Sequence, residues 1–470
     1  MNVPLRAICL MAGVLFVVGW PAARVVSRSR TWAAAATPAV GGIAVSIAVA
    51  ASILSGTSML PWLAVCAVSG WALFLRRRSS LVDEPSCGSL VLWVAVLVAL
   101  APVVLVDIPP VESDARYIWW FHAAWFRGGG SVAREGMEID SGNFLYSRSR
   151  YPPLLPGVIA AVWHFSDAYA AEMALRVSQL FTAAAIAAAA FHTAFVAQLT
   201  KRGAAIIAAI VAGMCWAANA GVGLVGFVDL AWAALFVSAA VLLLAGHLDR
   251  RVILIGSCFA SAAALVKFEG QVAGIILVVV VLLRAGREWR RVLPVVCAVF
   301  ASIVAWQAVV SFAGAPPDNR GNWSDLVHLL DSNALVHQRF VTTVGHLADQ
   351  LGWLVGLSVI GILVTVAAGR GAGLRLRQPG TLSILVVCAA YLTVLAFTFA
   401  VAPEDLDGYL EVAAYRAVIV VRILVLVDLT MTCLASARAL GVLATPDASA
   451  AAGCRLAGAS EPAGEVATES

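Results

Sequence analysis

The sequence predicts an all-α, polytopic membrane protein of about 12 to 14 transmembrane helices with a large outer loop. Three observations lead to this fold class. Of the residues, 61% are hydrophobic and only 12% are charged, whereas soluble domains carry about 25% charged residues. Long apolar runs recur from residue 7 to residue 435, and lipid requires each run to satisfy its own backbone hydrogen bonds, as a helix does. Short basic clusters separate these runs.

The basic clusters set the expected orientation, because cytoplasmic loops carry an excess of Lys and Arg. They are residues 24–30, 76–78, 200–202, 247–251, 284–291 and 370–377. Nearly every gap between them is long enough for a pair of helices, so the chain leaves the cytoplasm and returns within each gap. The outer segments are then residues 107–170, 219–229, 267–270, 314–350 and 403–416. All the unusual polar segments lie among them, which favours one shared outer site.

The spans expected between these points follow in order along the chain. They lie near residues 7–22, 34–54, 60–75, 89–106, 172–199, 203–219, 227–246, 252–266, 271–283, 292–313, 351–368, 380–402 and 417–435. Four parts result: N-terminal transmembrane helices (1–106), an outer loop with interfacial helices and a re-entry segment (107–170), a transmembrane core (171–435) and a cytoplasmic tail (436–470). The tail has no apolar face, which predicts disorder.

The outer loop is longer than forty residues, and loops of that length are generally functional or carry helices of their own. It contains the aromatic segment "DARYIWWFHAAWF". Tyr117, Trp120, Phe121 and Trp125 recur there at a spacing of three to four residues, which predicts a helix lying flat at the membrane surface.

Two carboxylates precede this aromatic segment. Asp114 has two interpretations that chemistry alone does not separate: an N-cap of the helix, or a general base or metal-orienting group at the membrane surface. Glu112 is the alternative carboxylate for the second role. Either residue would stand on the outer side in the predicted orientation.

The segment "SRSRYPPLLPG" returns the chain toward the membrane. The residue before a proline is pushed to extended geometry, so Tyr151 is expected to end the loop and Pro153 to open a short helix. The free N–H groups of that helix, beside Arg148 and Arg150, would seat a phosphate. The alternative is a chain that re-enters lipid with two interfacial arginines.

Three further outer positions carry charge. Lys267 and Glu269 in "KFEG" end a hydrophobic helix, where Gly270 is expected to permit the turn. Because residues at i and i+2 point to nearly opposite sides of a helix, we expect these two side chains to have separate partners. Asp229 is interpreted as an N-cap. Arg416 either binds an anion or extends to the membrane interface.

Several function classes have no visible basis in the sequence. It contains no Walker loop and no GxSxG, HExxH or GxGxxG motif. The nine cysteines form no CxxC pair, so they predict neither a metal site nor a disulfide framework. The net charge of +4 comes from short clusters between apolar runs, which indicates membrane orientation and no nucleic-acid binding.

Taken in order, the outer segments resemble those of bacterial GT-C glycosyltransferases, which take sugars from polyprenyl-phosphate carriers. This superfamily includes protein mannosyltransferases and the transferases that decorate lipid A. The resemblance runs from about residue 107 to residue 425. The resemblance rests on the segments "SDARYIWWFHA", "YPPLLP", "GFVDL", "KFEG" and "PEDLDGYL", the last followed by Arg416.

The resemblance implies an inverting transfer of a sugar to a cell-envelope acceptor (a glycan, lipid or protein) at the outer face of the bacterial plasma membrane. It implies Asp114 as the catalytic carboxylate, with Glu112 as the alternative, and a divalent cation, Mg or Mn, as a candidate cofactor. The expected partners are the polyprenyl-phosphate sugar, the acceptor and membrane lipids. The donor-binding candidates are Arg148, Arg150, Tyr151, Lys267, Glu269 and Arg416.

Two other classes compete with this reading. A transporter or lipid flippase also uses many helices and a few buried charges, but transporters commonly carry internal repeats, and the sequence holds no second copy of "DARYIWW" or "YPPLLP". A non-catalytic membrane scaffold with partner-binding outer loops is the third reading. A glycosyltransferase and a transporter differ in whether a sugar reaches an acceptor.

Overall fold

The computed structural model describes most of the chain. The described residues are 3–27, 29–77, 91, 93–97, 115–143, 149–167, 179–196, 201–219, 228–245, 248–316, 333–365, 379–401 and 406–439. Most of the predicted tail, residues 440–470, lies outside these ranges.

Every regular element in the described ranges is a helix, which confirms the predicted helical class. Six segments are long and apolar enough to cross a membrane, as a multi-pass membrane protein requires. They are Arg6–Val26, Arg30–Ser55, Met59–Arg77, Phe268–Phe312, Leu382–Ala400 and Ala413–Leu434. The larger number of spans expected from the sequence stays a prediction, because several expected spans fall partly outside the described ranges.

The helices follow one another with short connections in most of the described ranges. In chain order they are α1 (Val3–Val26), α2 (Arg30–Ser55), α3 (Met59–Arg77), the π-helix η2 (Ala115–Trp120), α5 (Phe121–Gly128), α6 (Gly130–Asn143), α7 (Leu154–His164), α9 (Gln179–Val196), α10 (Lys201–Asn219), α11 (Asp229–Ala245), α12 (Arg250–Val266), α13 (Phe268–Ala285), the 3-10 helix η4 (Gly286–Val292), α14 (Leu293–Phe312), α16 (Asn333–Thr365), α18 (Pro379–Ala400), α19 (Leu406–Ala417) and α20 (Ile419–Ala439).

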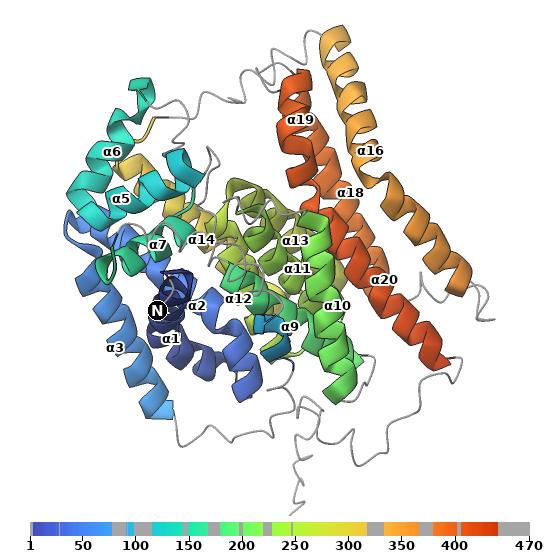
Figure 1. The fold of residues 1–470 in the computed structure, drawn as a ribbon, viewed down its shortest axis with the longest axis horizontal. Helices are drawn as coiled ribbons and strands as arrows, with labels where there is room; N and C mark the ends of the chain where they lie inside the picture. The colour runs from blue at the N-terminus through green and yellow to red at the C-terminus, as the bar shows by residue number, and fades with distance from the viewer. Residues whose placement is uncertain are drawn as a thin grey trace, which may run out of the picture.

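Helices α1 and α2 pack closely at the N-terminal side of the molecule (Figure 1). A Cβ atom on Gly19 would lie 2.4 Å from the carbonyl oxygen of Thr37, and one on Gly41 would lie 2.7 Å from that of Leu15. Small residues at helix crossings let two backbones approach, which is how helices in lipid gain packing contact. The two glycines therefore set the separation of the first helix pair.

Helix α11 lies at the centre of the molecule, between the N-terminal helices and the group formed by α16, α18, α19 and α20 (Figure 1). It contacts α9, α12, α18 and α20. Its residues from Asp229 to Leu244 are all buried, and a helix that is apolar all round belongs in a core. The one charged residue on it is Asp229, at its first position.

Helices α12 and α13 form the hairpin that the sequence predicts, with the reversal at "KFEG". The reason for Gly270 is different from the one expected. A Cβ atom there would lie 2.1 Å from the carbonyl oxygen of Ala263 in α12. Gly270 is therefore needed because the two helices touch, while the reversal itself takes place at Lys267, whose φ is −152° and ψ is 157°.

Helices α11 and α13 run in the same direction and are tied together at both ends. At the starting end, Lys267 contacts Asp229. At the other end, Arg284 of α13 donates a hydrogen bond of 2.8 Å to the carbonyl oxygen of Leu243. Charged side chains at both ends thus fix the register of two otherwise apolar helices.

The aromatic segment is helical, as predicted, but its side chains pack against protein. Trp120 stacks on Trp163 of α7, with ring centroids 4.0 Å apart, and Trp125 is 8% exposed. Trp119, which is outside the predicted stripe, is 1% exposed. The π-helix η2 precedes α5 and shifts the helical register, so the buried face differs from the one that regular spacing predicts.

Residues 333–350, which the sequence places in the outer segment 314–350, form the first half of α16, and their outer location stays a prediction. Val336, Thr343, Leu347 and Leu351 are buried. These positions recur at helical spacing, and their burial extends the helix N-terminally. Because polar residues lie between them, the mean hydropathy of this stretch is too low to predict a buried helix.

Candidate functional site

The candidate site begins with Asp229, the first residue of α11. The N-cap interpretation of this residue is wrong: the carbonyl oxygen of Val228 accepts the hydrogen bonds of the first turn, which places the cap at Val228. The Asp229 carboxylate instead accepts a hydrogen bond of 2.7 Å from the Lys267 ammonium. A negative charge at this position also favours the helix, because the N-terminal end of its dipole is positive.

Lys267 is the single residue that separates α12 from α13. Its extended backbone directs the side chain away from both helix axes and toward α11. The side chain is 6% exposed, and that of Asp229 is 4% exposed. A buried charge is tolerated where it is paired and hydrogen-bonded, and each of these two charges supplies the partner of the other.

Glu269 joins the same ion-pair group. Its Oε1 lies 3.1 Å from the Lys267 ammonium, so the prediction that Lys267 and Glu269 have separate partners is wrong. That prediction assumed that both residues lie on one regular helix. Because Lys267 is extended and Glu269 is in the first turn of α13, the two side chains converge.

Arg416 completes the group from the end of α19. Its Nε lies 3.7 Å from Oδ2 of Asp229, and its side chain is 12% exposed. Asp229, Lys267, Glu269 and Arg416 are hereafter the junction cluster. Its four residues come from α11, the α12–α13 turn, α13 and α19, so segments almost 190 positions apart in the chain meet at one point.

The electrostatics of the junction cluster favour its ionised form. Asp229 and Lys267 lie outside the six candidate spans. Burial acts against ionisation of Asp229, but the positive charges of Lys267 and Arg416 hold the pKa of its carboxyl below the usual value. Burial likewise acts to lower the pKa of Lys267, but Asp229 and Glu269 raise it above the usual value. With two cations and two carboxylates, the cluster carries no net charge.

Two aromatic side chains border the junction cluster. Tyr391 of α18 interacts electrostatically with Asp229, Lys267 and Glu269, and its hydroxyl donates a hydrogen bond of 3.3 Å to the carbonyl oxygen of Ala417. Trp232, one turn after Asp229, has its ring centroid 6.1 Å from that of Tyr391. These rings separate the charges from the apolar core of α11.

Tyr151 links the junction cluster to the outer loop. It lies close enough to Lys267 to interact with it electrostatically, and its ring stacks on Trp119, with centroids 5.5 Å apart. Trp119 belongs to η2, which begins at Ala115. The helix η2 therefore stacks, through Trp119, on a tyrosine that lies within electrostatic range of Lys267.

Arg150 has partners away from the junction cluster. Its guanidinium donates hydrogen bonds of 2.7 Å to the carbonyl oxygen of Pro316 and of 3.0 Å to that of Ala315. The indole of Trp306 in α14 donates one of 3.0 Å to the carbonyl oxygen of Arg150. Arg150 thus fastens the start of the re-entry segment to the end of α14, and its phosphate-binding role stays a prediction.

We expect Arg150→Gln to lower the midpoint of thermal unfolding, because two hydrogen bonds from a charged donor stabilise a fold by about 1.5 to 3 kcal/mol each. The measurement is thermal unfolding in detergent micelles. Arg76→Gln is the matched control, because Arg76 is exposed at the end of α3. Equal midpoints for both variants would contradict this fastening role.

Some predicted residues cannot be placed. Glu112, Asp114 and Arg148 lie outside the described residues. Within the described part of the chain, no group of three or more His, Cys, Asp or Glu side chains is arranged to hold a metal ion. The two carboxylates that do meet there, Asp229 and Glu269, are already paired with Lys267.

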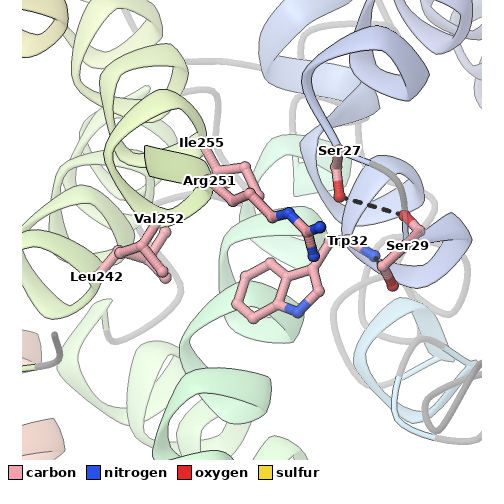
Figure 2. A pocket seen from close by; sticks show the side chains of 7 residues that line it. All are labelled: Ser27, Ser29, Trp32, Leu242, Arg251, Val252 and Ile255. Atoms are coloured by element: carbon pink, nitrogen blue, oxygen red, sulfur yellow. Dashed lines mark hydrogen bonds between the residues drawn. The ribbon is translucent and has the colours of Figure 1, made fainter. Parts of the chain in front are cut away.

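A small cavity lies at the other end of α12 (Figure 2). Arg251 and Val252 of α12 line it together with Trp32 of α2 and with Ser27 and Ser29, which lie between α1 and α2. Its volume of about 10 Å³ holds no more than about one water molecule. It is about 24 Å from Lys267 along α12, so it is separate from the junction cluster and too small for a substrate.

Sequence reasoning missed two members of the site. The sequence predicts Asp229 as a helix cap, and Tyr391 carries no signal because it lies inside an apolar run. One signal for Asp229 was present: it is a lone carboxylate among apolar residues in "GFVDLAW", and such a residue requires a buried partner. The partner itself, 38 positions away, has no local signal.

Comparison of this chain with protein-family models, curated proteins and solved structures yields no match.

Proposed function

We propose that this protein is a membrane glycosyltransferase that moves a sugar from a polyprenyl-phosphate carrier to a cell-envelope acceptor. The observation that carries the proposal is the convergence at the junction cluster. Two cations, Lys267 and Arg416, meet at Asp229, and Lys267 is within electrostatic range of Tyr151, on which Trp119 of η2 stacks. A catalytic base and a cationic phosphate site must reach one reacting centre, and we propose that the loop that carries Asp114 supplies the base at this one.

The proposed reaction balances without a nucleotide or an oxidant. The oxygen of an acceptor hydroxyl attacks the anomeric carbon of the sugar while Asp114 takes the hydroxyl proton. The bond from the anomeric carbon to the phosphate oxygen breaks, and its electron pair stays on the lipid phosphate. The phosphate gains negative charge in this step, which Lys267 and Arg416 stabilise, because preorganised cations favour a transition state in which charge develops.

The carboxylates of the junction cluster hold its two cations in defined positions. Asp229 contacts both Lys267 and Arg416, and Glu269 contacts Lys267, so both cations are positioned before the donor arrives. Preorganised groups need no rearrangement at the moment of reaction. Because the carboxylates of the cluster are committed to Lys267, they do not offer a ligand set for Mg or Mn, and no step of the proposed mechanism passes through a metal.

A transfer assay tests the proposal. Purified protein in lipid nanodiscs is incubated with a panel of radiolabelled polyprenyl-phosphate sugars and a membrane fraction that contains envelope acceptors. We expect label from one donor to pass to an acceptor, and no label to pass from nucleotide sugars, which serve as the control. Uptake of the labelled compound into proteoliposomes with no transfer to any acceptor would instead identify a transporter or flippase.

A further inference from the structure

The 3-10 helix η4 (Gly286–Val292) forms the entire connection between two apolar helices. α13 ends at Ala285 and α14 begins at Leu293, and the two helices pack against each other as a hairpin within one apolar stretch. With 18 and 20 residues, they are about 27 and 30 Å long, which matches a bilayer core of about 30 Å. The reversal of such a hairpin lies at the level of the lipid headgroups, and here the reversal is η4.

Two of the three side-chain rows of η4 have partners within the protein. A 3-10 helix has three residues per turn, so the side chains at i and i+3 eclipse each other. In one row, Arg291 and Glu288 form an ion pair of 2.9 Å. In another row, Val292 is buried and Trp289 is 45% exposed. The first row is therefore neutral, and the second row anchors η4 to the protein through Val292.

The third row of η4 consists of two cations. Arg287 and Arg290 are both exposed, and among the described residues neither one forms an ion pair with a carboxylate. A spacing of three residues sets their Cα atoms about 6 Å apart along the helix axis. Like charges at such a spacing destabilise a helix, so this row attracts an anionic ligand.

The apolar surroundings of this row separate a lipid from a soluble anion. The guanidinium carbon of Arg290 lies 5.7 Å from the ring centroid of Trp289, and tryptophan is enriched at membrane–water interfaces. Leu283 and Leu293, on the two flanking helices, are 75% and 38% exposed. A free phosphate would leave these apolar side chains in water. A phospholipid contacts the arginines with its phosphate and the apolar side chains with its acyl chains.

We propose that η4 binds the headgroup of an anionic phospholipid, with Arg287 and Arg290 donating hydrogen bonds to its phosphate. Guanidinium groups bind phosphate with bidentate geometry. Phosphatidylglycerol is preferred over phosphatidylcholine, because the choline ammonium would bring a third positive charge beside the two arginines. The predicted orientation puts η4 on the cytoplasmic side, where anionic lipids attract basic segments. No residue of the junction cluster takes part, so the inference is independent of the proposed function.

Quenching of Trp289 fluorescence by brominated lipids tests this lipid preference at η4 itself. The full-length protein is placed in phosphatidylcholine bilayers that contain brominated phosphatidylglycerol or, in a separate sample, the same fraction of brominated phosphatidylcholine. The signal of Trp289 is the difference between each protein and the same protein with Trp289→Phe. We expect phosphatidylglycerol to associate with η4 at least about fivefold more strongly than phosphatidylcholine, since one arginine near an anionic surface accounts for about that factor.

Substitutions on η4 should move this preference in both directions. Arg287→Gln combined with Arg290→Gln is expected to abolish it. Glu288→Gln is expected to raise it about two- to fivefold, because Arg291 loses its ion-pair partner and can bind the lipid. Arg76→Gln, which removes one exposed arginine from the end of α3, is the matched control for Arg290→Gln alone and is expected to leave the preference unchanged.

Equal quenching by the two brominated lipids in the natural protein would overturn the proposal. An equal loss of preference in Arg76→Gln and Arg290→Gln would do the same, because it would assign the preference to the total charge of the protein. Displacement of brominated phosphatidylglycerol by inorganic phosphate at constant ionic strength would identify a site for a soluble anion and reject the lipid. An unchanged preference in the variant without both arginines would remove Arg287 and Arg290 from the site.

Discussion

Lys267→Met is expected to lower the free energy of unfolding by about 3 to 5 kcal/mol, because it leaves a buried carboxylate without its main partner. Asp229 is 4% exposed and lies 2.7 Å from the Lys267 ammonium. Arg416, at 3.7 Å, is too distant to replace that hydrogen bond. The measurement is unfolding in mixed detergent micelles, followed by tryptophan fluorescence and compared with Arg76→Met, in which an exposed arginine is replaced.

The double variant Asp229→Asn with Lys267→Met distinguishes an unpaired charge from simple loss of packing. Removing both charges is expected to restore much of the stability lost in the single variant, because replacing both partners of a buried ion pair costs far less than breaking it. If the losses of the two single variants simply add in the double variant, the pair makes no coupled contribution to stability and its central place in the fold is wrong.

Asp114→Asn is expected to reduce sugar transfer by about 100- to 10,000-fold, which is the usual contribution of general acid–base catalysis. This substitution separates the two interpretations of Asp114, because Asn caps a helix about as well as Asp does. A role limited to capping therefore predicts normal transfer and normal stability. A role as the base predicts lost transfer with an unchanged thermal midpoint and unchanged binding of the donor.

Glu112→Gln is the matched control for Asp114→Asn, because it removes the neighbouring carboxylate from the same loop. Transfer is expected to fall less than about threefold in this variant if Asp114 is the base. Lost transfer in Glu112→Gln with normal transfer in Asp114→Asn would move the catalytic role to Glu112. Full transfer in both variants would remove the base from this loop.

The helical class and most helix positions in the described ranges could be predicted from the sequence, because they depend on local hydropathy. The hairpin of α12 and α13 is one example: apolar runs on either side of "KFEG" suffice to locate it. The start of α16 is the opposite case. Its buried residues are interspersed with polar ones, so the packing against α18, α19 and α20 explains why this part of the chain is helical.

The candidate site was predicted in part, for a physical reason. Lys267, Glu269 and Arg416 are charges next to apolar runs, and such positions stand out in a sequence. Which charges pair depends on the backbone at one residue, Lys267, whose extended conformation turns its side chain toward Asp229. Neither the spacing nor the composition of the sequence predicts that conformation, so only the structure shows which charged side chains form ion pairs.

The length of α16 has a consequence for locating the membrane. Its 33 residues span about 50 Å, whereas the bilayer core is about 30 Å thick. The helix packs against α18 and α20, which have 22 and 21 residues and are therefore about 17 Å shorter. In a variant in which the nine cysteines of the chain are replaced by serine or alanine, single cysteines introduced along α16 and probed with a water-soluble thiol reagent form a molecular ruler, on which the lipid boundary is read directly from the position where labelling stops.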